Sequence, residues 1–339
     1  MSRRPGGSVR RLEGLDALPA AVTGGCVATV GVFDGVHLGH QAVMRRVAAR
    51  AAALGAEPAV VTFAGHPKRV LVGQAPPTVT SLEHRLLLFE RLGVQAVLIL
   101  RFTPELRRLT AEEFVRRVLA DGLGLRELVL GFDCKFGRDR GGTADSLRPL
   151  AAEMGFGLEE VPPLRLGGRA VSSTAIREAV KLGELDRAAA MLGRPVSLLG
   201  TVVRGDGRGR ALGFPTANLD PHHELRPPDG VYAALAEVGG KLHPAVLNIG
   251  LRPTFGRPGR SVEVHLIGFE GDLYGRELEA FFLARLRGER IFDSAEKLSA
   301  RIARDVEAAA AAVEAARGSW LIPGPLMPIE HPEAPRRRG

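Results

Sequence analysis

The segment GVFDGVHLGH, residues 31–40, combines residue types that could bind and stabilise a phosphate group. It contains three glycines spaced four apart and two histidines spaced three apart, namely Gly31, Gly35, Gly39, His37 and His40. Glycines let backbone amides approach an anion closely, and a helix that begins here would add free N–H groups. The two histidines would face one side of that helix, where protonated imidazoles could neutralise charge on a transferred phosphoryl group. The spacing therefore predicts a phosphate-binding loop.

Other interpretations of this segment stay open at the level of residue types. Asp34 and the downstream His66 could join the two histidines around a zinc ion, although no fixed spacing requires it. The glycines could also form only a tight turn that happens to contain histidines. In the phosphate-loop interpretation, Phe33 and Asp34 belong to the nucleotide-binding segment together with the glycines.

Three later segments place further polar residues after predicted strands or at the start of a predicted helix. Their sequences are TFAGHP (62–67), GFDCKFGRDRGGT (131–143) and SSTAIREAV (172–180). In the last segment, the hydroxyls of Ser172, Ser173 and Thr174 could bind phosphate, with Arg177 one helical turn later. Taken alone, such hydroxyls form a plain helix cap more often than a ligand site. Together, the four loops at one sheet edge predict a nucleotide site.

The segment GTVVRGDGRGRALGFPTANL, residues 200–219, predicts a second phosphate-binding loop. Its candidate binding residues, which surround Asp206 or follow it, are Gly205, Gly209, Arg210 and Gly213. Thr216 and Asn218 lie two apart, so in an extended segment they share a face and could present oxygen ligands to Mg2+. The alternative is a turn-rich connection between barrel strands with its polar residues exposed.

The segment SVEVHLIGF alternates in hydropathy and predicts a strand with one buried face. Val262, Val264 and Leu266 would be buried, whereas Glu263 would lie on the other face. Such a face is usually only solvated. A glutamate that faces a phosphate loop could instead accept the proton of an attacking hydroxyl, which phosphoryl transfer needs besides positioning and charge stabilisation.

These candidate residues sit on two different patterns of elements. From about residue 25 to 185, apolar strands alternate with amphipathic helices, which predicts an α/β domain with a parallel sheet and ligands at its carboxyl edge. After residue 193, strand-like runs follow one another without helices, which predicts a small antiparallel barrel or sandwich, closed by a helix from about 294 to 317. Residues 1–15 and 322–339 are expected to be disordered tails.

Composition restricts the classes of function. The formal net charge is +8, but residues 1–12 and 334–339 supply +7 of it, which does not favour nucleic-acid binding by the body of the chain. The two cysteines, Cys26 and Cys134, fit neither a disulfide framework nor a zinc ribbon, and they indicate a reducing cytoplasm. No apolar segment reaches the length of a membrane span or a signal peptide, so no membrane partner is expected.

The chain resembles the bacterial bifunctional riboflavin kinase/FMN adenylyltransferase (FAD synthetase) family. GVFDGVHLGHQ and VSSTAIR match the two signatures of its nucleotidyltransferase domain, and GRALGFPTANL, PDGVYAA, NIGLRPTF and VEVHLIGFEGDLYG match its kinase domain in order. The resemblance implies a Rossmann-like nucleotidyltransferase domain over residues 20–190 and a six-stranded antiparallel β-barrel kinase domain with a terminal helix over 193–318. It further implies riboflavin, FMN and ATP as substrates, and FMN and FAD as products.

The resemblance also implies roles for the candidate residues. His37 and His40 would stabilise the α-phosphate and pyrophosphate of ATP, and the hydroxyls of 172–174 with Arg177 would hold phosphates. Thr216 and Asn218 would bind Mg2+ and ATP, and Glu263 would be the base that acts on the ribityl hydroxyl of riboflavin.

One departure from the family pattern separates this chain from its relatives. Where the family has a Gly-x-Asp-Phe-x-Phe-Gly run, residues 131–137 read GFDCKFG, and Cys134 replaces an aromatic residue near the ligands. An alternative hypothesis is therefore a riboflavin kinase whose adenylyltransferase activity is weakened or absent. A third is a flavin-binding or RNA-binding regulator without catalysis, although such a module would need neither Glu263 nor the histidine pair.

Overall fold

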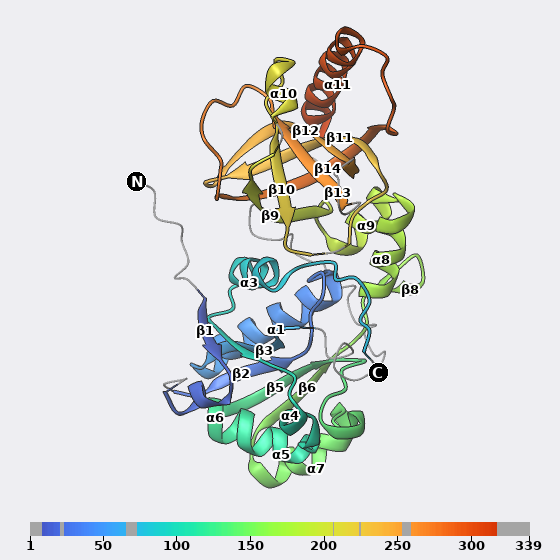
Figure 1. The fold of residues 1–339 in the computed structure, drawn as a ribbon. Helices are drawn as coiled ribbons and strands as arrows, with labels where there is room; N and C mark the ends of the chain where they lie inside the picture. The colour runs from blue at the N-terminus through green and yellow to red at the C-terminus, as the bar shows by residue number, and fades with distance from the viewer. Residues whose placement is uncertain are drawn as a thin grey trace.

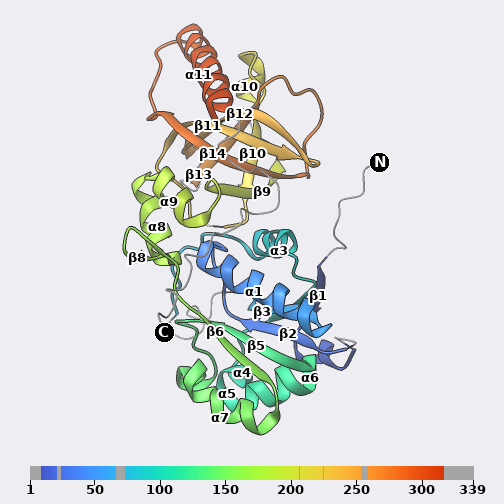
Figure 2. The same cartoon turned by 180° about the vertical axis from the view of Figure 1, so that it is seen from behind.

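The structure, a computed structural model, describes residues 9–20, 24–65, 73–205, 207–223, 225–252 and 259–316. His66, Asp206 and the expected tail at 322–339 lie outside these residues. The described chain forms a parallel sheet with helices on both faces and a closed barrel above it (Figures 1 and 2). The predicted α/β domain and antiparallel barrel are both confirmed.

The N-terminal sheet contains six parallel strands in the order β1-β4-β3-β2-β5-β6. The strands are β1 (Arg10–Glu13), β2 (Cys26–Val30), β3 (Glu57–Phe63), β4 (Ala96–Leu100), β5 (Leu125–Gly131) and β6 (Gly157–Val161). Every residue of β2 and β4 is buried, because helices cover both faces of the sheet. Because the strands are parallel, their carboxyl ends lie at one edge of the sheet.

Helices pack on the two faces of this sheet in separate groups (Figures 1 and 2). On the face toward the barrel lie α1 (Leu38–Leu54) and α3 (Leu82–Arg91). On the other face lie α4 (Pro104–Arg108), α5 (Ala111–Phe114), the π-helical turn Val115–Ala120, α6 (Asp121–Leu123) and α7 (Ala144–Met154). Short 3-10 helices cover Leu15–Ala20 and Arg138–Arg140, and the two-stranded sheet β7 (Arg165–Leu166) and β8 (Arg169–Ala170) follows β6.

The expectation of a disordered N-terminal tail over residues 1–15 is wrong for the strand β1. This strand pairs in parallel with β4. Backbone hydrogen bonds from Arg10 N to Gln95 O and from Gly14 N to Ile99 O extend this pairing. Leu12 is buried in the sheet core, while the arginines beside it point outward. Four residues with one inward side chain carry too little periodicity to be distinguished from a basic tail.

The C-terminal barrel closes in the strand order β10-β13-β12-β11-β14-β9. Its strands are β9 (Ser197–Val203), β10 (Ala217–Pro221), β11 (Gly230–Val238), β12 (Lys241–Arg252), β13 (Gly259–Leu266) and β14 (Glu277–Arg287), and the short α10 (Arg208–Ala211) precedes β10. The terminal helix α11 (Ala295–Ala316) packs on the outside of the barrel, where Ala309 is buried against Val231 and Val246. The expected closing helix is thus confirmed.

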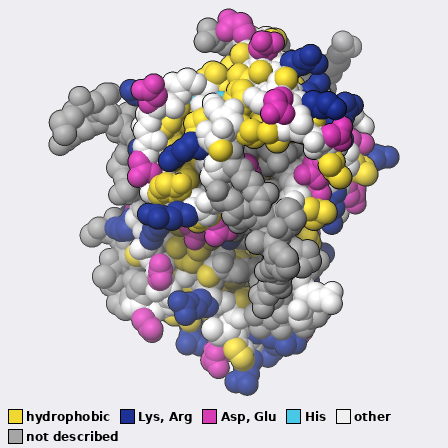
Figure 3. Space-filling view, turned by 45° about the horizontal axis from the view of Figure 1, so that its top comes forward, with side chains coloured by type: hydrophobic (Ala, Val, Ile, Leu, Met, Phe, Trp, Pro, Cys, Tyr) yellow, Lys and Arg dark blue, Asp and Glu magenta, His cyan; other side chains and the backbone are white. Residues whose placement is uncertain are grey.

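Two helices, α8 (Ser173–Leu182) and α9 (Leu185–Leu192), connect the sheet to the barrel. Their buried residues, including Ile176 and Leu192, share one hydrophobic cluster with barrel residues such as Leu198 and Tyr232. Residues 190–193, where the sequence places the domain boundary, lie at the end of α9 in this packed junction. Basic and acidic side chains are interspersed on the face of the molecule shown in Figure 3.

Candidate active sites

The loop between β2 and α1 brings the two predicted histidines together. His37 is the N-cap of α1, and its Nδ1 accepts a hydrogen bond of 3.4 Å from His40 N. The two imidazole rings stack with their centroids 3.6 Å apart. A Cβ on Gly39 would lie 3.3 Å from the His37 ring, so glycine leaves room for this stack. The two imidazoles therefore lie together at the N-terminus of α1, where the first amides of a helix can bind a phosphate.

The charge state of these histidines differs from the sequence-based expectation. Burial, aided by the charge of Arg194, lowers the pKa of His37 to about 3. Burial and the neighbouring His37 hold the pKa of His40 well below its ordinary value. In the unliganded protein both rings are therefore neutral, and they can offer hydrogen bonds to a phosphate but not a positive charge.

Asp34 anchors the loop and joins it to the segment that begins with Ser172. Its Oδ1 accepts hydrogen bonds from Val79 N (2.8 Å) and Thr80 N (3.1 Å), and its Oδ2 pairs with Arg177 at 2.9 Å. Only 5% of the Asp34 side chain and 14% of the Arg177 side chain are exposed. The two predicted phosphate segments are thus tied to each other by a buried ion pair.

The hydroxyls at the start of α8 have different partners. Ser172 caps the helix by accepting a hydrogen bond from Ala175 N, so the plain-cap interpretation describes this residue. Ser173 donates a hydrogen bond of 2.9 Å to the Asp34 carbonyl, and Thr174 accepts one of 3.2 Å from Arg177. Among the described residues, no cluster of three or more metal-ligating side chains is found, which gives the zinc interpretation no support there.

The loop holds an unusual backbone conformation. Phe33 and Val36 have positive φ angles of 52° and 40°, a region that non-glycine residues, and β-branched ones above all, rarely occupy. Gly35, at φ 81°, takes the same region without that steric cost. The ring of Phe33 lies over Gly31, where an added Cβ would come within 2.9 Å of it. Strain of this kind persists only where surrounding contacts enforce it.

Two buried arginines that sequence reasoning missed supply some of those contacts. Arg85 donates to the carbonyls of Val32 and Phe63 and to Thr62, and so ties the ends of β2 and β3 together. Arg194 donates to the carbonyl of Gly35 at 2.9 Å. The signal for Arg85 was available, because it falls on the apolar face of a helix where a cation needs partners. Arg194 lies in a connection with no such periodicity.

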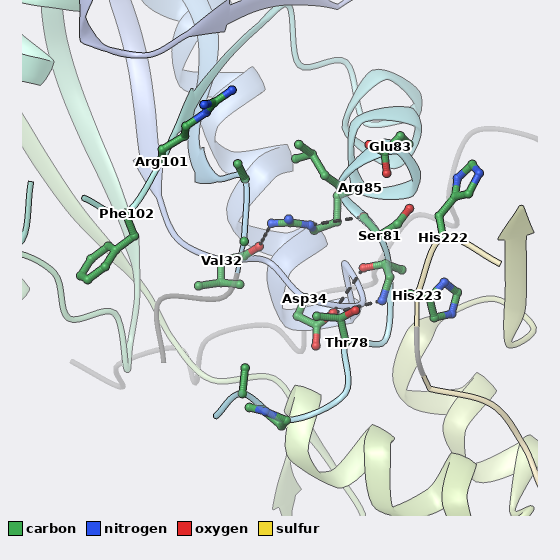
Figure 4. Close-up of a pocket in the computed structure, with 16 residues that line it drawn as sticks. Val32, Asp34, Thr78, Ser81, Glu83, Arg85, Arg101, Phe102, His222 and His223 are labelled. Carbon is green, nitrogen blue, oxygen red and sulfur yellow. Dashed lines mark hydrogen bonds between the residues drawn. The ribbon is translucent and has the colours of Figure 1, made fainter. Parts of the chain in front are cut away.

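A cavity of about 510 Å3 opens beside this loop and is lined by both halves of the molecule (Figure 4). Its residues from the sheet domain include Val32, Asp34, Thr80, Arg85, Arg101 and Phe102. His222 and His223, which follow β10 of the barrel, lie on the opposite side from Arg101 and Phe102 (Figure 4). The cavity thus combines cationic and aromatic side chains next to the phosphate loop.

The departure at Cys134 has a defined structural setting. Its Sγ donates a hydrogen bond of 3.2 Å to the carbonyl of Val30 at the end of β2. Burial raises the pKa of this thiol to about 12, so it stays protonated. Two residues earlier, Phe132 is 46% exposed, and Phe136 is buried. The loop after β5 therefore retains an exposed aromatic side chain although Cys134 itself is small.

The second candidate site lies on the outer face of β10 and β13. Val262, Val264 and Leu266 are buried as predicted. Asn218 is the register partner of Glu263, and Thr216 Oγ1 donates to Glu263 Oε2 at 3.4 Å. The three polar residues, Thr216, Asn218 and Glu263, are half-buried. The structure thus places on one face the residues that the spacing grouped.

The glycine-rich loop packs directly on this group. A Cβ on Gly205 would overlap the side-chain amide of Asn218, and one on Gly209 would come within 3.1 Å of Thr216 Oγ1. Gly213 has a φ of 87°, and Arg210 is exposed to solvent. Asn248 of β12 is the register partner of Glu263 on its other side. Sequence reasoning missed Asn248, although its position in the strand HPAVLNIG follows the same alternation.

Two family models match the chain side by side. The first, described as FAD synthetase, matches residues 20–175, and the second, described as riboflavin kinase, matches residues 192–313. A Pseudomonas fluorescens protein named bifunctional riboflavin kinase/FMN adenylyltransferase is 42% identical over 85% of this chain and 93% of its own length. The Escherichia coli K12 protein of the same name is 36% identical over 88% of this chain and 96% of its own.

The similarity extends to solved structures. A Streptococcus pneumoniae chain described as a macrolide-efflux protein superposes with a TM-score of 0.76 and 30% identity, over 89% of this chain and 99% of its own. The likeness therefore includes the sheet, the barrel and their connection. In the part of this chain that the structure describes, no helix is long and apolar enough to cross a membrane.

Proposed function

Because the chain belongs to the bifunctional riboflavin kinase/FMN adenylyltransferase family, we propose that it converts riboflavin to FMN and then FMN to FAD. The first reaction consumes one ATP and releases ADP, and the second consumes another ATP and releases pyrophosphate. The observation that supports the proposal is that one chain brings together two separate groups of polar residues, one in each segment that a family model matches.

In the adenylyl-transfer reaction, a phosphate oxygen of FMN attacks the α-phosphorus of ATP and pyrophosphate leaves. We assign the polyphosphate to the loop of residues 31–40, where the neutral imidazoles of His37 and His40 and the first amides of α1 donate hydrogen bonds. Gly31, Phe33, Gly35 and Gly39 shape this loop, and the Asp34–Arg177 ion pair keeps it against α8. A bound polyanion would raise the pKa of both histidines and favour their protonated, charge-neutralising form.

The acceptor pocket in this proposal is the cavity beside the loop. It is large enough to hold a planar heteroaromatic ring system, it offers the side chain of Phe102 for stacking, and Arg101 provides a positive charge for a phosphate. His222 and His223 close the cavity from the barrel side (Figure 4). FMN would therefore be held between the two domains.

In the kinase reaction, the ribityl 5'-hydroxyl of riboflavin attacks the γ-phosphorus of ATP. We assign Glu263 as the base that accepts the hydroxyl proton, and the glycine loop with Gly205, Gly209 and Gly213 as the cover of the phosphates. Thr216 and Asn218 offer a hydroxyl and an amide oxygen, a donor set that suits Mg2+ when ATP phosphates complete its shell. Such an ion would neutralise phosphate charge. Arg210, exposed beside the loop, adds positive charge.

The proposed reactions require small molecules only, and the free, protonated thiols of Cys26 and Cys134 fit the reducing cytoplasm expected for the protein. The proposal is tested by incubating the purified chain with riboflavin, ATP and Mg2+ and separating the flavins over time. FMN should appear first and FAD second. Accumulation of FMN alone would support the kinase with an impaired second site, and unchanged riboflavin would contradict the kinase assignment.

A further inference from the structure

Arg194 connects the junction of the two domains to the backbone of the phosphate loop. Its Nη2 donates to the carbonyl of Gly35 at 2.9 Å, and its Nη1 donates to the carbonyl of Val36 at 3.3 Å. These two carbonyls belong to the stretch with positive φ angles that precedes His37. Arg194 is only 5% exposed. The guanidinium therefore holds the two peptide groups that set the position of His37.

A cation buried this deeply needs a countercharge, and Glu279 of the barrel acts on it through space, without a direct ion pair. Strand β14 runs beside the Arg194 segment, since Phe282 N donates to Val196 O and Phe281 is the register partner of Ser197. Burial lowers the pKa of Arg194 to about 10, and the carboxylate of Glu279 raises it. Among the described residues, Nε of Arg194 has no hydrogen-bond partner. Its charge is stabilised by the carbonyls of Gly35, Val36 and Leu192 and, through space, by the carboxylate of Glu279.

Glu279 is itself fixed from both domains. Its Oε1 lies 2.8 Å from His84 Nε2 of α3 and accepts a hydrogen bond of 2.8 Å from Ser197 Oγ of the barrel. Its Oε2 lies 3.4 Å from Arg91 Nη2, also of α3. Although burial favours its protonated form, these neighbours hold the pKa of Glu279 at about 2. The carboxylate is thus charged and immobilised at physiological pH.

We propose that Arg194 is a positioning residue for adenylyl transfer, and that the nearby negative charge of Glu279 in the barrel helps to keep it against the phosphate loop. The inference rests on the proposed function, and it extends it: the kinase domain contributes to the geometry of the other active site. A displacement of the Gly35 and Val36 carbonyls would move His37, which stands at the N-terminus of α1. Neither residue touches substrate in this proposal.

The test measures FAD formation from added FMN and ATP in the full-length chain, with FMN formation from riboflavin measured in the same preparations. Arg194→Gln should lower kcat for FAD formation about a hundredfold, and Glu279→Gln about tenfold, because small displacements of reacting groups cost rates of this order. Both variants should keep the kinase rate and change the KM for ATP little. If the wild type makes FAD and neither variant is slower, the inference is overturned although the proposed function stands.

Two further variants distinguish a positioning role of Arg194 from a general loosening of the contact between the domains. Glu237→Gln is the matched control, since Glu237 also pairs with Arg91 across the interface, at 3.1 Å, but lies in β11 and is not among the charges that act on Arg194. It should leave the rate of FAD formation within about twofold of wild type. The double variant of Arg194→Gln and Glu279→Gln should be no slower than Arg194→Gln alone, because Glu279 acts through Arg194. Equal losses in both glutamate variants, or losses that multiply, would overturn the inference.

A conservative variant covers the case in which Arg194→Gln does not fold. Arg194→Lys keeps the charge near Glu279 but cannot donate to both carbonyls with one planar group. It should fold, as judged by an unchanged kinase rate, and lose less of the FAD-forming rate than Arg194→Gln or any folded neutral variant. A full FAD-forming rate in a folded neutral variant such as Arg194→Met would contradict the proposal.

Discussion

The two candidate sites differ in how far the folded chain has already organised them. At the sheet edge, Asp34 and His37 are buried, and Asp34 is satisfied by Arg177 and by backbone amides before any ligand binds. At the barrel, Thr216 and Glu263 are half-buried, and the hydrogen bond between them is 3.4 Å long. The residues of the first site therefore contribute to the stability of the fold. Those of the second site lie on a barrel surface whose fold does not depend on them.

The difference follows from the elements that carry the residues. Residues 31–36 of the phosphate loop belong to no strand or helix, so side chains such as Arg194 and Gln41 satisfy carbonyls that no neighbouring strand pairs with. Asn218 and Glu263 stand on barrel strands, whose backbone groups pair with neighbouring strands regardless of the side chain. Substitutions should consequently cost both stability and activity at the first site, and activity alone at the second.

The largest effect should come from Glu263→Ala, which tests the barrel half of this comparison. Loss of the base should lower the rate of FMN formation about a thousandfold, while added FMN is still converted to FAD. The free energy of unfolding in urea should change by less than about 1 kcal/mol, because the residue is half-buried and weakly paired. Glu270→Ala, an exposed change in the same barrel, is the control. Loss of both activities would argue against two independent sites.

His37→Ala should show the reverse selectivity. Removal of a hydrogen-bond donor to the polyphosphate should slow FAD formation from FMN a few hundredfold, roughly the cost of deleting one stabilising donor in an active site. FMN formation from riboflavin should remain at the wild-type rate, measured by separation of the flavins. An equal fall in both reactions would show that the sheet domain supports the kinase and would break the comparison.

Asp34→Asn should show how much the first site contributes to the stability of the fold. Neutralising one partner of a buried ion pair leaves Arg177 uncompensated, and we expect the free energy of unfolding to fall by about 3 kcal/mol. Urea denaturation followed by circular dichroism measures this change. Asp139→Asn, whose side chain is 94% exposed, should be neutral in the same assay. If Asp34→Asn leaves the free energy of unfolding unchanged, the first site contributes no more to stability than Glu263 does.

Acid should destabilise the protein through the buried histidines of the sheet edge and the junction. The pKa values of His37 and His223 are both lowered to about 3, mainly by burial. Below pH 6.5, these two histidines therefore bind protons in the unfolded chain but stay neutral in the folded chain. Stability is therefore full above pH 6.5 and falls as the pH drops toward 3, by about 2 kcal/mol per histidine between pH 7 and 5.

Urea titrations at pH 7 and 5 measure this slope, and His37→Gln should reduce it by one histidine's share. The carboxylate of Glu279, whose pKa is held near 2, contributes stability above pH 4.5 that is lost only as the pH falls further toward 2, outside this window. A slope that does not respond to His37→Gln would show that this imidazole is protonated in the folded state.

The smallest effect should come from Cys134→Ala. The thiol is neutral and donates one hydrogen bond, to the carbonyl of Val30, so its loss should cost about 1 kcal/mol of stability or less. The KM for FMN should change less than about twofold, since the exposed aromatic Phe132 lies nearby in the chain. A large rise in KM would instead support the hypothesis that this position limits the adenylyltransferase.

Local sequence was sufficient for much of the fold and for grouping the candidate residues. Alternating strands and helices predicted the parallel sheet, and runs of strands predicted the barrel, because each pattern depends on near neighbours in the chain. The two-residue spacing of Thr216 and Asn218 and the alternation around Glu263 placed these residues correctly on one face. The family motifs added the chemistry, which spacing alone left open between a phosphate loop, a metal site and a turn.

The amino-acid sequence by itself thus determined the two types of domain and which side chains could meet phosphate. Only the tertiary structure decided that β1 joins the sheet, that His37 and His40 are neutral, that Arg194 binds the loop carbonyls, and that Glu279 meets His84 in the junction. The reason is that burial and charge pairing depend on groups brought together from distant parts of the chain. Glu279 lies 195 positions from His84, and no local period records their 2.8 Å contact.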